Sequence, residues 1–404
     1  SACTASGVNT PYIVAMNSHT CDGVGYDVTG VDTSTIKNIN LFASRVWLIP
    51  STTLKAWYLP VSSKAGAANA IDLGPVARHG GHLVTMETWT LDAGLGMDDH
   101  AVFVTSNGEV IVYKGTDPSA VDTWSLVGVW HIGAPVGNRC AIKWGGDCLL
   151  LTRDGLVQMT QTLRMSQAES GSVSKGNSFN LTDKIASAVT EVISLYSTNF
   201  GWEMIYFAGA NMLILNVPIT VSGSSTKVQQ QYVMNTLSKA WCSWTGIKAN
   251  CWIVFGGNLY FGGNTVVGKA WSTGTNADNG TNITGTIQQA FSDFGAPGVS
   301  KRWTMARPVL RANGEPGVSI GMNTDFRENE VAETPSFTPQ INPLWGTAIF
   351  GVDVWGSEGE INDDWRGVNA QGYVGAMRMK VVARSIGDVE WLSTDFILEP
   401  GGPL

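Results

Sequence analysis

Short apolar runs separated by glycine-rich turns recur along the chain, and this pattern constrains the fold more than any other feature. In "VFVTSNGEVIVY" (102–113), apolar residues recur on both sides of the pair Asn107-Gly108. Alternation with a period of two is typical of half-buried strands. An Asn-Gly pair between two such runs predicts a two-residue hairpin turn of type I′. The segment therefore predicts two antiparallel strands.

The hairpin pattern recurs about every 35–50 residues, which is the usual length of a propeller blade. Further turns are expected at Gly145-Gly146, Asp154-Gly155, Gly209-Ala210-Asn211, Asn235 to Lys239, Gly256-Gly257-Asn258 and Gly262-Gly263-Asn264. Aromatic strands close several units, at Trp124 to Trp130, Trp241 to Trp244 and Trp271. We expect these tryptophans to pack between blades, the alternative being that they stack on a ligand.

Composition supports an all-β protein with a large interior. The chain is 44% hydrophobic and 14% charged, against a usual charged share of about 25%. Its 47 glycines can supply the positive-φ positions that many tight turns need. One segment departs from this texture: "LTDKIASAVTEVISLYS" (181–197) has apolar residues at helical spacing and predicts an amphipathic helix, with Thr182 or Asp183 as N-cap.

The chain is expected to divide into two regions. Residues 1–274 are predicted to form propeller blades, and residues 275–404 a β-sandwich-like C-terminal domain, with "STGTNADNGTNITGT" (272–286) as a turn-rich connector. In the second region we expect strands at 300–310, 317–323, 375–385 and 389–400. The regular aromatic spacing of "PLWGTAIFGVDVWG" (343–356) indicates an extended arm.

Charge and cysteine usage exclude some functions. The net charge is −8, and the densest basic stretch is only "KRWTMAR" (301–307), so strong sequence-specific DNA binding is not expected. The six cysteines form no Cys-x-x-Cys pair and are predicted to be reduced, small apolar residues made in a reducing compartment. Cys140 and Cys148 flank one hairpin turn, so a disulfide between them stays open. No apolar stretch is long enough to span a membrane.

The sequence carries no catalytic signature. Motifs of serine hydrolases, zinc proteases and P-loop enzymes are missing, so we predict no enzyme activity, no catalytic, cofactor-binding or metal-binding residues, and no cofactor. His79 with His82 is a remote candidate for a metal pair. Asp98 and Asp99 before His100 could do acid–base work, although we expect them to cap backbone amides in a turn. "TNADNGTN" (275–282) resembles a calcium loop only in composition.

The segment "TDPSAVDTWSLVG" (116–128) is similar to the aspartate-box turn of sialidase-type propellers. In that turn an acidic residue precedes Thr-Trp, and the turn is a structural element of the blade. The resemblance implies a propeller and gives no indication of glycosidase chemistry.

A longer resemblance runs from about Leu41 to the C-terminus. "DDHAVFVTSNGEVIVYKGTDPSAVDTWSLVGVWHIGAPVGNRC", "GGDCLLLTRDGLV", "LTDKIASAVT", "NFGWE" and "KRWTMARPVL" closely resemble the β-propeller tail nozzle or hub proteins of short-tailed bacteriophages, also called packaged-DNA stabilisation or head-completion proteins. Members usually carry further propeller sequence before the position of Ser1, so we expect blade completion to need residues outside this chain.

The resemblance implies a structural virion protein of the phage tail, assembled in the host cytoplasm. It implies a homo-oligomeric ring, commonly a hexamer, below the portal and tail adaptor, with tail fibres or spikes as further partners. The ring would extend the DNA channel, retain packaged DNA and permit its ejection. A lumen with few lysines and arginines would let double-stranded DNA pass without specific binding.

Two other functions remain open. One is a receptor- or carbohydrate-binding propeller that uses exposed tryptophans. The other is a hydrolase on a propeller scaffold, for which Asp98 and Asp99 are candidates without known geometry. If the chain is a ring-forming component, we expect alanine at Trp303 or Trp391 to impair folding or assembly first.

Overall fold

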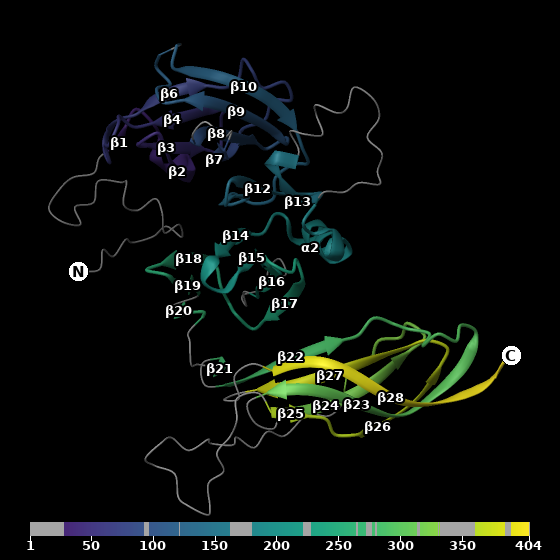
Figure 1. Ribbon diagram of the computed structural model, residues 1–404. Helices are drawn as coiled ribbons and strands as arrows, with labels where there is room; N and C mark the ends of the chain where they lie inside the picture. Colours follow the sequence, from purple (N-terminus) through teal and green to yellow (C-terminus); the bar gives the residue numbers. More distant parts are fainter. Residues whose placement is uncertain are drawn as a thin grey trace, which may run out of the picture. The chain divides into compact units, whose positions relative to one another are not determined.

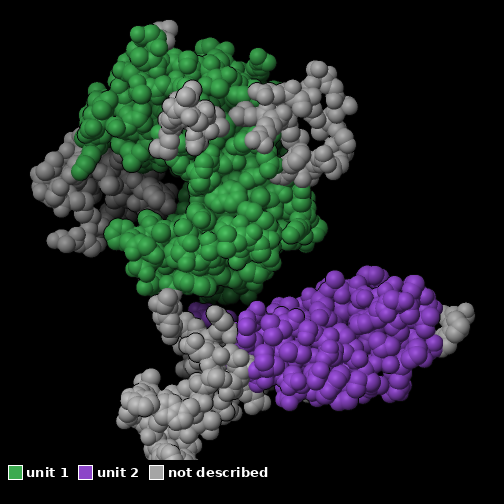
Figure 2. Space-filling model, viewed as in Figure 1, with its two compact units in different colours: residues 1–271 green, residues 272–404 purple. Residues whose placement is uncertain are grey.

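The computed structural model describes most of the 404 residues. The described ranges are 28–92, 97–120, 122–161, 180–220, 228–263, 266–271, 277–278, 281–312, 316–329, 331, 360–383 and 389–403. The chain divides into two compact units, Ser1–Trp271 and Ser272–Leu404, which are coloured separately in Figure 2. Each unit is built almost wholly of antiparallel strands.

In its described residues, unit 1 contains five small antiparallel sheets that follow one another in chain order, and one further two-stranded sheet (Figure 1). Each sheet is an antiparallel meander, apart from a short parallel pair, β1 (Val28–Thr29) with β5 (Gly66–Ala67). The strands of sheets 1 and 2 are β2 (Ile36–Phe42), β3 (Arg45–Pro50), β4 (Lys55–Tyr58) and β6 (Asn69–Asp72), then β7 (Leu83–Asp92), β8 (Met97–Thr105), β9 (Glu109–Gly115) and β10 (Trp124–His131). Those of sheets 3 to 5 are β11 (Ala141–Trp144), β12 (Asp147–Thr152) and β13 (Gly155–Gln158), then β14 (Glu203–Phe207), β15 (Met212–Val217), β16 (Gln230–Asn235) and β17 (Trp241–Thr245), then β18 (Cys251–Phe255), β19 (Asn258–Gly262) and β20 (Val267–Lys269).

The sheets are arranged as blades. The first strand of each sheet contacts the first strand of the next, so β2 meets β7, β7 meets β11, β11 meets β14, and β14 meets β18. Meanders stacked side by side through their first strands are the construction of a β-propeller. The prediction of an all-β chain with propeller blades is therefore confirmed.

Large aromatic side chains fill the space between the first two blades. Trp47 of β3 is fully buried and stacks on Trp124 of β10, with ring centroids 5.7 Å apart. Phe103 of β8 packs edge-on against Trp47 at 5.5 Å. Such contacts bury much apolar area and have a specific geometry, so they fix how the two sheets meet. Trp124 thus packs between blades, as the sequence suggested.

The hairpin turns that fall within the described residues lie where the sequence placed them, but the turn type predicted at Asn107 is wrong. The loop between β8 and β9 has three residues, and only Gly108, with φ +84°, has positive φ. A type I′ turn needs positive φ at both central residues. That geometry occurs instead between β18 and β19, where Gly256 and Gly257 have φ values of +56° and +74°.

The acidic turn between β9 and β10 is held by its own side chains. Asp117 Oδ1 accepts hydrogen bonds from Ser119 N at 3.0 Å and Ser119 Oγ at 2.7 Å. It also pairs with Arg45 of the first blade at 3.1 Å. Asp117 therefore has a structural role within the turn, in agreement with the aspartate-box resemblance.

The predicted amphipathic helix is present. A 3-10 turn, η3 (Asp183–Ile185), leads into α2 (Ala186–Tyr196), which buries Val189, Val192 and Ile193. Thr182 stands at the N-cap of η3 but makes no side-chain cap bond, and the N-cap of α2 is Ile185, not Asp183, so the predicted cap is wrong for the α-helix. The Thr182 hydroxyl instead accepts a hydrogen bond from Leu156 N at 3.2 Å, which ties the helix to the third blade.

Unit 2 is a two-sheet sandwich, so the predicted C-terminal fold is confirmed. One sheet has the order β21 (Ala277–Asp278), β22 (Thr281–Gln288), β27 (Gly375–Ala383), β24 (Gly317–Thr324). In the other, β23 (Val299–Ala312) pairs with β25 (Glu360–Asn362), β26 (Arg366–Gly372) and β28 (Val389–Pro403). Apolar residues of both sheets form the core, among them Ala306, Leu310, Val318, Met377, Met379 and Val381.

The four strands predicted in this region all exist, as β23, β24, β27 and β28. The connector was predicted too long, because residues 281–286 belong to β22. Threonine and isoleucine in "TNITGTI" favour a strand over a turn. The predicted arm at 343–356 lies outside the described residues.

Candidate functional site

Polar side chains on β2, β7, β8 and β11 form two hydrogen-bonded groups, which are linked by the charge of Lys143 acting on Glu87. Asn40 Nδ2, on β2, donates to Glu87 Oε1, on β7, at 3.0 Å. Lys143 Nζ, on β11, donates to Thr90 Oγ1 at 2.7 Å, and that hydroxyl donates to Asp99 Oδ1 at 2.6 Å. We call these five residues the inner-strand cluster. Asn40, Glu87, Thr90 and Lys143 lie on the first strands of their blades, which surround the central channel in a propeller, and Asp99 lies on β8.

Burial dominates the electrostatics of this cluster. Burial raises the pKa of Glu87, while the Thr88 amide, Asn40 and the charge of Lys143 oppose the rise. Burial also raises the pKa of the nearby Cys140 thiol to about 12. A thiol with so high a pKa is protonated at neutral pH and is a poor nucleophile. Burial therefore favours the protonated forms of both the Glu87 carboxyl and the Cys140 thiol.

The raised pKa of Glu87 predicts a specific pH dependence of stability. Between the ordinary glutamate pKa, about 4.3, and the raised folded value, the folded state binds more protons than the unfolded state. This contribution to the free energy of unfolding is therefore largest at low pH and falls as pH rises. Glu87→Gln keeps the Oε1 acceptor, so it should gain stability relative to wild type between pH 4 and pH 7.

Urea unfolding at several pH values checks this prediction, and Glu109→Gln is the matched control. Burial alone would raise the pKa of Glu109. Hydrogen bonds from the backbone amides of His79 and Arg78, together with the His79 ring, outweigh burial and lower that pKa. Ionised Glu109 stabilises the wild-type fold above the ordinary glutamate pKa, and this stabilisation is lost as pH falls. Glu109→Gln lacks it and should therefore be less stable than wild type between pH 4 and pH 7. Parallel pH profiles for the two variants would contradict the assignment.

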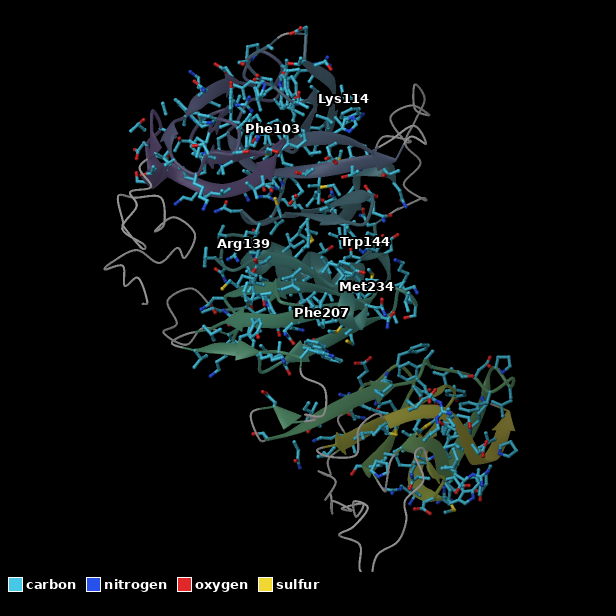
Figure 3. All side chains as sticks on the ribbon, turned by 60° about the vertical axis from the view of Figure 1, so that its left-hand side comes forward. Phe103, Lys114, Arg139, Trp144, Phe207 and Met234 are labelled. Atoms are coloured by element: carbon cyan, nitrogen blue, oxygen red, sulfur yellow. The ribbon has the colours of Figure 1, made fainter. Side chains whose placement is uncertain are left out.

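A second polar network joins the later blades around Arg139, which is labelled in Figure 3. Arg139 Nη1 pairs with Glu203 Oε1 at 2.6 Å, and its Nη2 donates to Asn250 O at 3.3 Å. Glu203 Oε2 accepts the Trp252 amide at 2.8 Å. Burial raises the pKa of Glu203, and Arg139 opposes that rise. One ion pair thus connects the third, fourth and fifth blades.

Asn216 is the other centre of this network, and sequence reasoning missed it. It is fully buried, and its Nδ2 donates to Gly201 O at 2.8 Å and Ala249 O at 3.0 Å. Its Oδ1 accepts from Gln231 Nε2 at 2.8 Å and from the Trp252 indole at 3.1 Å. Every polar atom of this amide is satisfied, so it fixes blade packing. An asparagine within the apolar run "LILNVPI" was the available signal.

The histidine and aspartate candidates of the sequence take other roles. His79 Nδ1 lies 3.0 Å from the buried carboxylate of Glu109, and its ring packs on His131, with centroids 4.6 Å apart. The described residues, His79 and His82 among them, contain no group of three or more His, Cys, Asp or Glu side chains suited to a metal ion. The predicted turn at Asp98 and Asp99 is wrong, since the ladder between β7 and β8 extends to Met97.

The cations of the basic stretch 301–307 in the second unit lie beside carbonyl or carboxylate oxygens of the same unit. Lys301 is buried, and its Nζ donates to the carbonyls of Ala296, Val299 and Tyr373 at 2.6, 2.9 and 2.9 Å. The arginines of β23 face carboxylates across the strand: Arg302 lies 4.0 Å from Glu399, Arg307 lies 2.5 Å from Asp395, and Arg311 pairs with Glu390.

Two further expectations concern cysteines and membranes. Cys140 and Cys148 are free and buried, and Cys242 and Cys251 are also free, so the disulfide considered for the first pair is not formed. No helix in the described part of the chain has the length and apolarity needed to cross a bilayer.

Comparison with known proteins adds only distant structural likenesses. Neither a family model nor a curated protein matches the chain. Among solved structures, it is similar to the exo-β-1,3-galactanase of Phanerochaete chrysosporium, with 9% identity, 89% of this chain and 99% of that one covered, and a TM-score of 0.33. It is also similar to the Cps50 (Swd1) β-propeller domain of Myceliophthora thermophila, with 10% identity, coverages of 57% and 66%, and a TM-score of 0.30. The WD40 domain of SCAP from fission yeast matches with 12% identity, coverages of 65% and 71%, and a TM-score of 0.29.

These likenesses correct one prediction. Because a glycoside hydrolase is among the similar structures, the prediction that the chain is not an enzyme is contradicted, and we withdraw it. The identities and TM-scores are too low to transfer a substrate, a reaction or a catalytic residue from any of these proteins to this chain.

Proposed function

We propose that the chain is a structural component of a phage tail, a nozzle or hub subunit that forms a ring and extends the DNA channel. The proposal rests on the sequence resemblance together with one observation on the charges. Lys301, Arg302 and Arg307 of the densest basic stretch (301–307) each lie beside carbonyls or a carboxylate of their own unit, although the Arg302 side chain is 59% exposed. A stretch whose cations lie beside carboxylates has little excess positive charge with which to hold phosphates, and a channel subunit should let DNA slide.

Negative-stain electron microscopy of the purified chain tests the proposal. The expected result is a closed ring of subunits, six on the family resemblance, around a central opening. A population made only of single chains or irregular clusters would overturn it. Electrophoretic mobility shift with duplex DNA gives a second measure, and tight binding that survives physiological salt would also speak against a sliding channel.

A second candidate function is recognition of carbohydrate by exposed tryptophans. Trp271 is 44% exposed and stacks on Trp244 with the ring planes 6° apart, and Trp365 is 40% exposed. Flat, partly exposed indoles are suitable platforms for sugar rings. Binding on a glycan array that is lost in Trp271→Ala or Trp365→Ala would favour this function over the ring.

A further inference from the structure

Strand β22 (Thr281–Gln288) forms one edge of its sheet in unit 2. It pairs with β27 on one side, from Ile283 to Gln288. On the other side, β21 pairs only with Thr281 and Asn282. In the part of the chain that the structure describes, the outer edge from Ile283 onwards has no strand beside it. An unpaired edge offers free backbone donors and acceptors to another strand.

This edge lacks the usual protection against pairing. Natural edge strands carry charges, prolines or bulges that discourage a second chain. Strand β22 contains no charged residue and no proline, its ladder to β27 has no bulge, and its residues are exposed from Thr281 to Ile287. By contrast, the long edge strand β28 carries Glu390, Asp395 and Glu399.

The apolar face of β22 continues the core of the sandwich outwards. Gly285 and Ile287 lie opposite Val381 and Met379, which are buried. Directly paired residues share a face, so Ile283 and Ile287 extend the core face, yet they are 51% and 46% exposed. A Cβ on Gly285 would meet no atom within 4 Å.

The sequence of the free edge reads the same in both directions. Residues 283–287 are Ile-Thr-Gly-Thr-Ile. If two copies paired antiparallel about Gly285, Ile283 would lie opposite Ile287 of the second copy, and Thr284 opposite Thr286. Apolar residues would meet apolar residues and threonines would meet threonines, which are favourable cross-strand pairs. This five-residue segment begins at Ile283, because β21 pairs with the two preceding residues, Thr281 and Asn282.

We propose that the outer edge of β22 is a self-association site, at which a second copy of this chain adds its own β22 antiparallel, centred on Gly285. Charge supports a second copy as the occupant. Each chain carries a net charge of −8, and this strand is a place where two copies can meet without bringing like charges together. The contact goes beyond the proposed ring, because a two-fold contact closes at two copies and cannot generate a ring.

A cysteine scan tests the register of this contact on the full-length chain. In the Cys242→Ser background, Gly285→Cys would place two thiols directly opposite each other, with Cα atoms about 4.5–5.5 Å apart, within disulfide range. Thr284→Cys is the matched control, because Thr284 of each copy lies diagonal to its counterpart, with Cα atoms about 7–8 Å apart. Under mild oxidation, the Gly285→Cys chain should form covalent dimers at least tenfold faster than the control.

Two further variants test the apolar contact. Ile287→Lys should abolish dimers in sedimentation velocity, while Leu392→Lys on β28, where the native side chain is 47% exposed, should leave them unchanged. Equal cross-linking of Gly285→Cys and Thr284→Cys, or unchanged association of Ile287→Lys, would overturn the proposed contact. Rings that persist in Ile287→Lys would leave the proposed function standing, and covalent Gly285→Cys dimers without rings would reject that function alone.

Discussion

Replacing Arg139 with alanine should lower the free energy of unfolding of the propeller unit by about 3–5 kcal/mol. Arg139 and Glu203 form an ion pair at 2.6 Å, and the Glu203 residue is 7% exposed. Without the guanidinium, the Glu203 carboxylate stays buried and loses its cation, while Oε2 still accepts the Trp252 amide. The loss of stability therefore reflects the uncompensated buried charge of Glu203. The third, fourth and fifth blades would also lose the ion pair that connects them.

Urea denaturation followed by tryptophan fluorescence measures this effect. Lys55→Ala is the control in the same unit, since Lys55 pairs with Asp72 at 3.9 Å with both side chains about half exposed, and such pairs contribute about 0–1 kcal/mol. The double variant Arg139→Met with Glu203→Leu should be less destabilised than Arg139→Ala, because it removes both charges. A loss no larger than that of Lys55→Ala would mean that the pair does not hold the blades together.

The hairpins could be predicted from the sequence because their determinants are local. Alternation of apolar residues sets the strands, and glycine, asparagine or aspartate sets the turn between them, as at Gly145-Gly146 between β11 and β12. The turn type at Asn107 could not be predicted in the same way. The register of the β8–β9 ladder adds a third residue to the loop, and that register depends on which faces are buried.

The inner-strand cluster and the Arg139 network could not be predicted, because their members are far apart in the chain. Asn40 meets Glu87 because β2 and β7 are neighbouring first strands, and Arg139, which precedes β11, meets Glu203 because β11 lies beside β14. Single residues such as Asn216 gave a weak local signal, a polar side chain in an apolar strand. Its four partners come from separate loops and strands, so the signal indicated burial without indicating the contacts.

Replacing Trp303 with alanine should destabilise the C-terminal sandwich by about 3–5 kcal/mol. Trp303 lies on β23, is fully buried, and packs on Phe294 with ring centroids 5.6 Å apart. The indole lies so close to Gly375 that a Cβ there would be 2.7 Å from Trp303 Cζ2. Removing the ring leaves a cavity between the two sheets that backbone on both sides prevents from closing, so the lost contacts are not recovered.

Thermal unfolding of the full chain, followed by near-ultraviolet circular dichroism, measures the loss. Trp365→Ala is the control, because Trp365 is 40% exposed and contacts Arg307 through a cation–π interaction at 5.1 Å, which is worth about 0.5–1 kcal/mol at such a site. The destabilisation by Trp391→Ala should lie between those of Trp303→Ala and Trp365→Ala, since Trp391 is half-buried and its indole donates to Thr394 Oγ1 at 2.9 Å.

If Trp303→Ala leaves too little folded protein to measure, Trp303→Phe should show a smaller loss in the same direction. A Trp303→Ala transition that coincides with that of Trp365→Ala would show that the core around Gly375 closes over the missing ring, contrary to the geometry of β23 and β27.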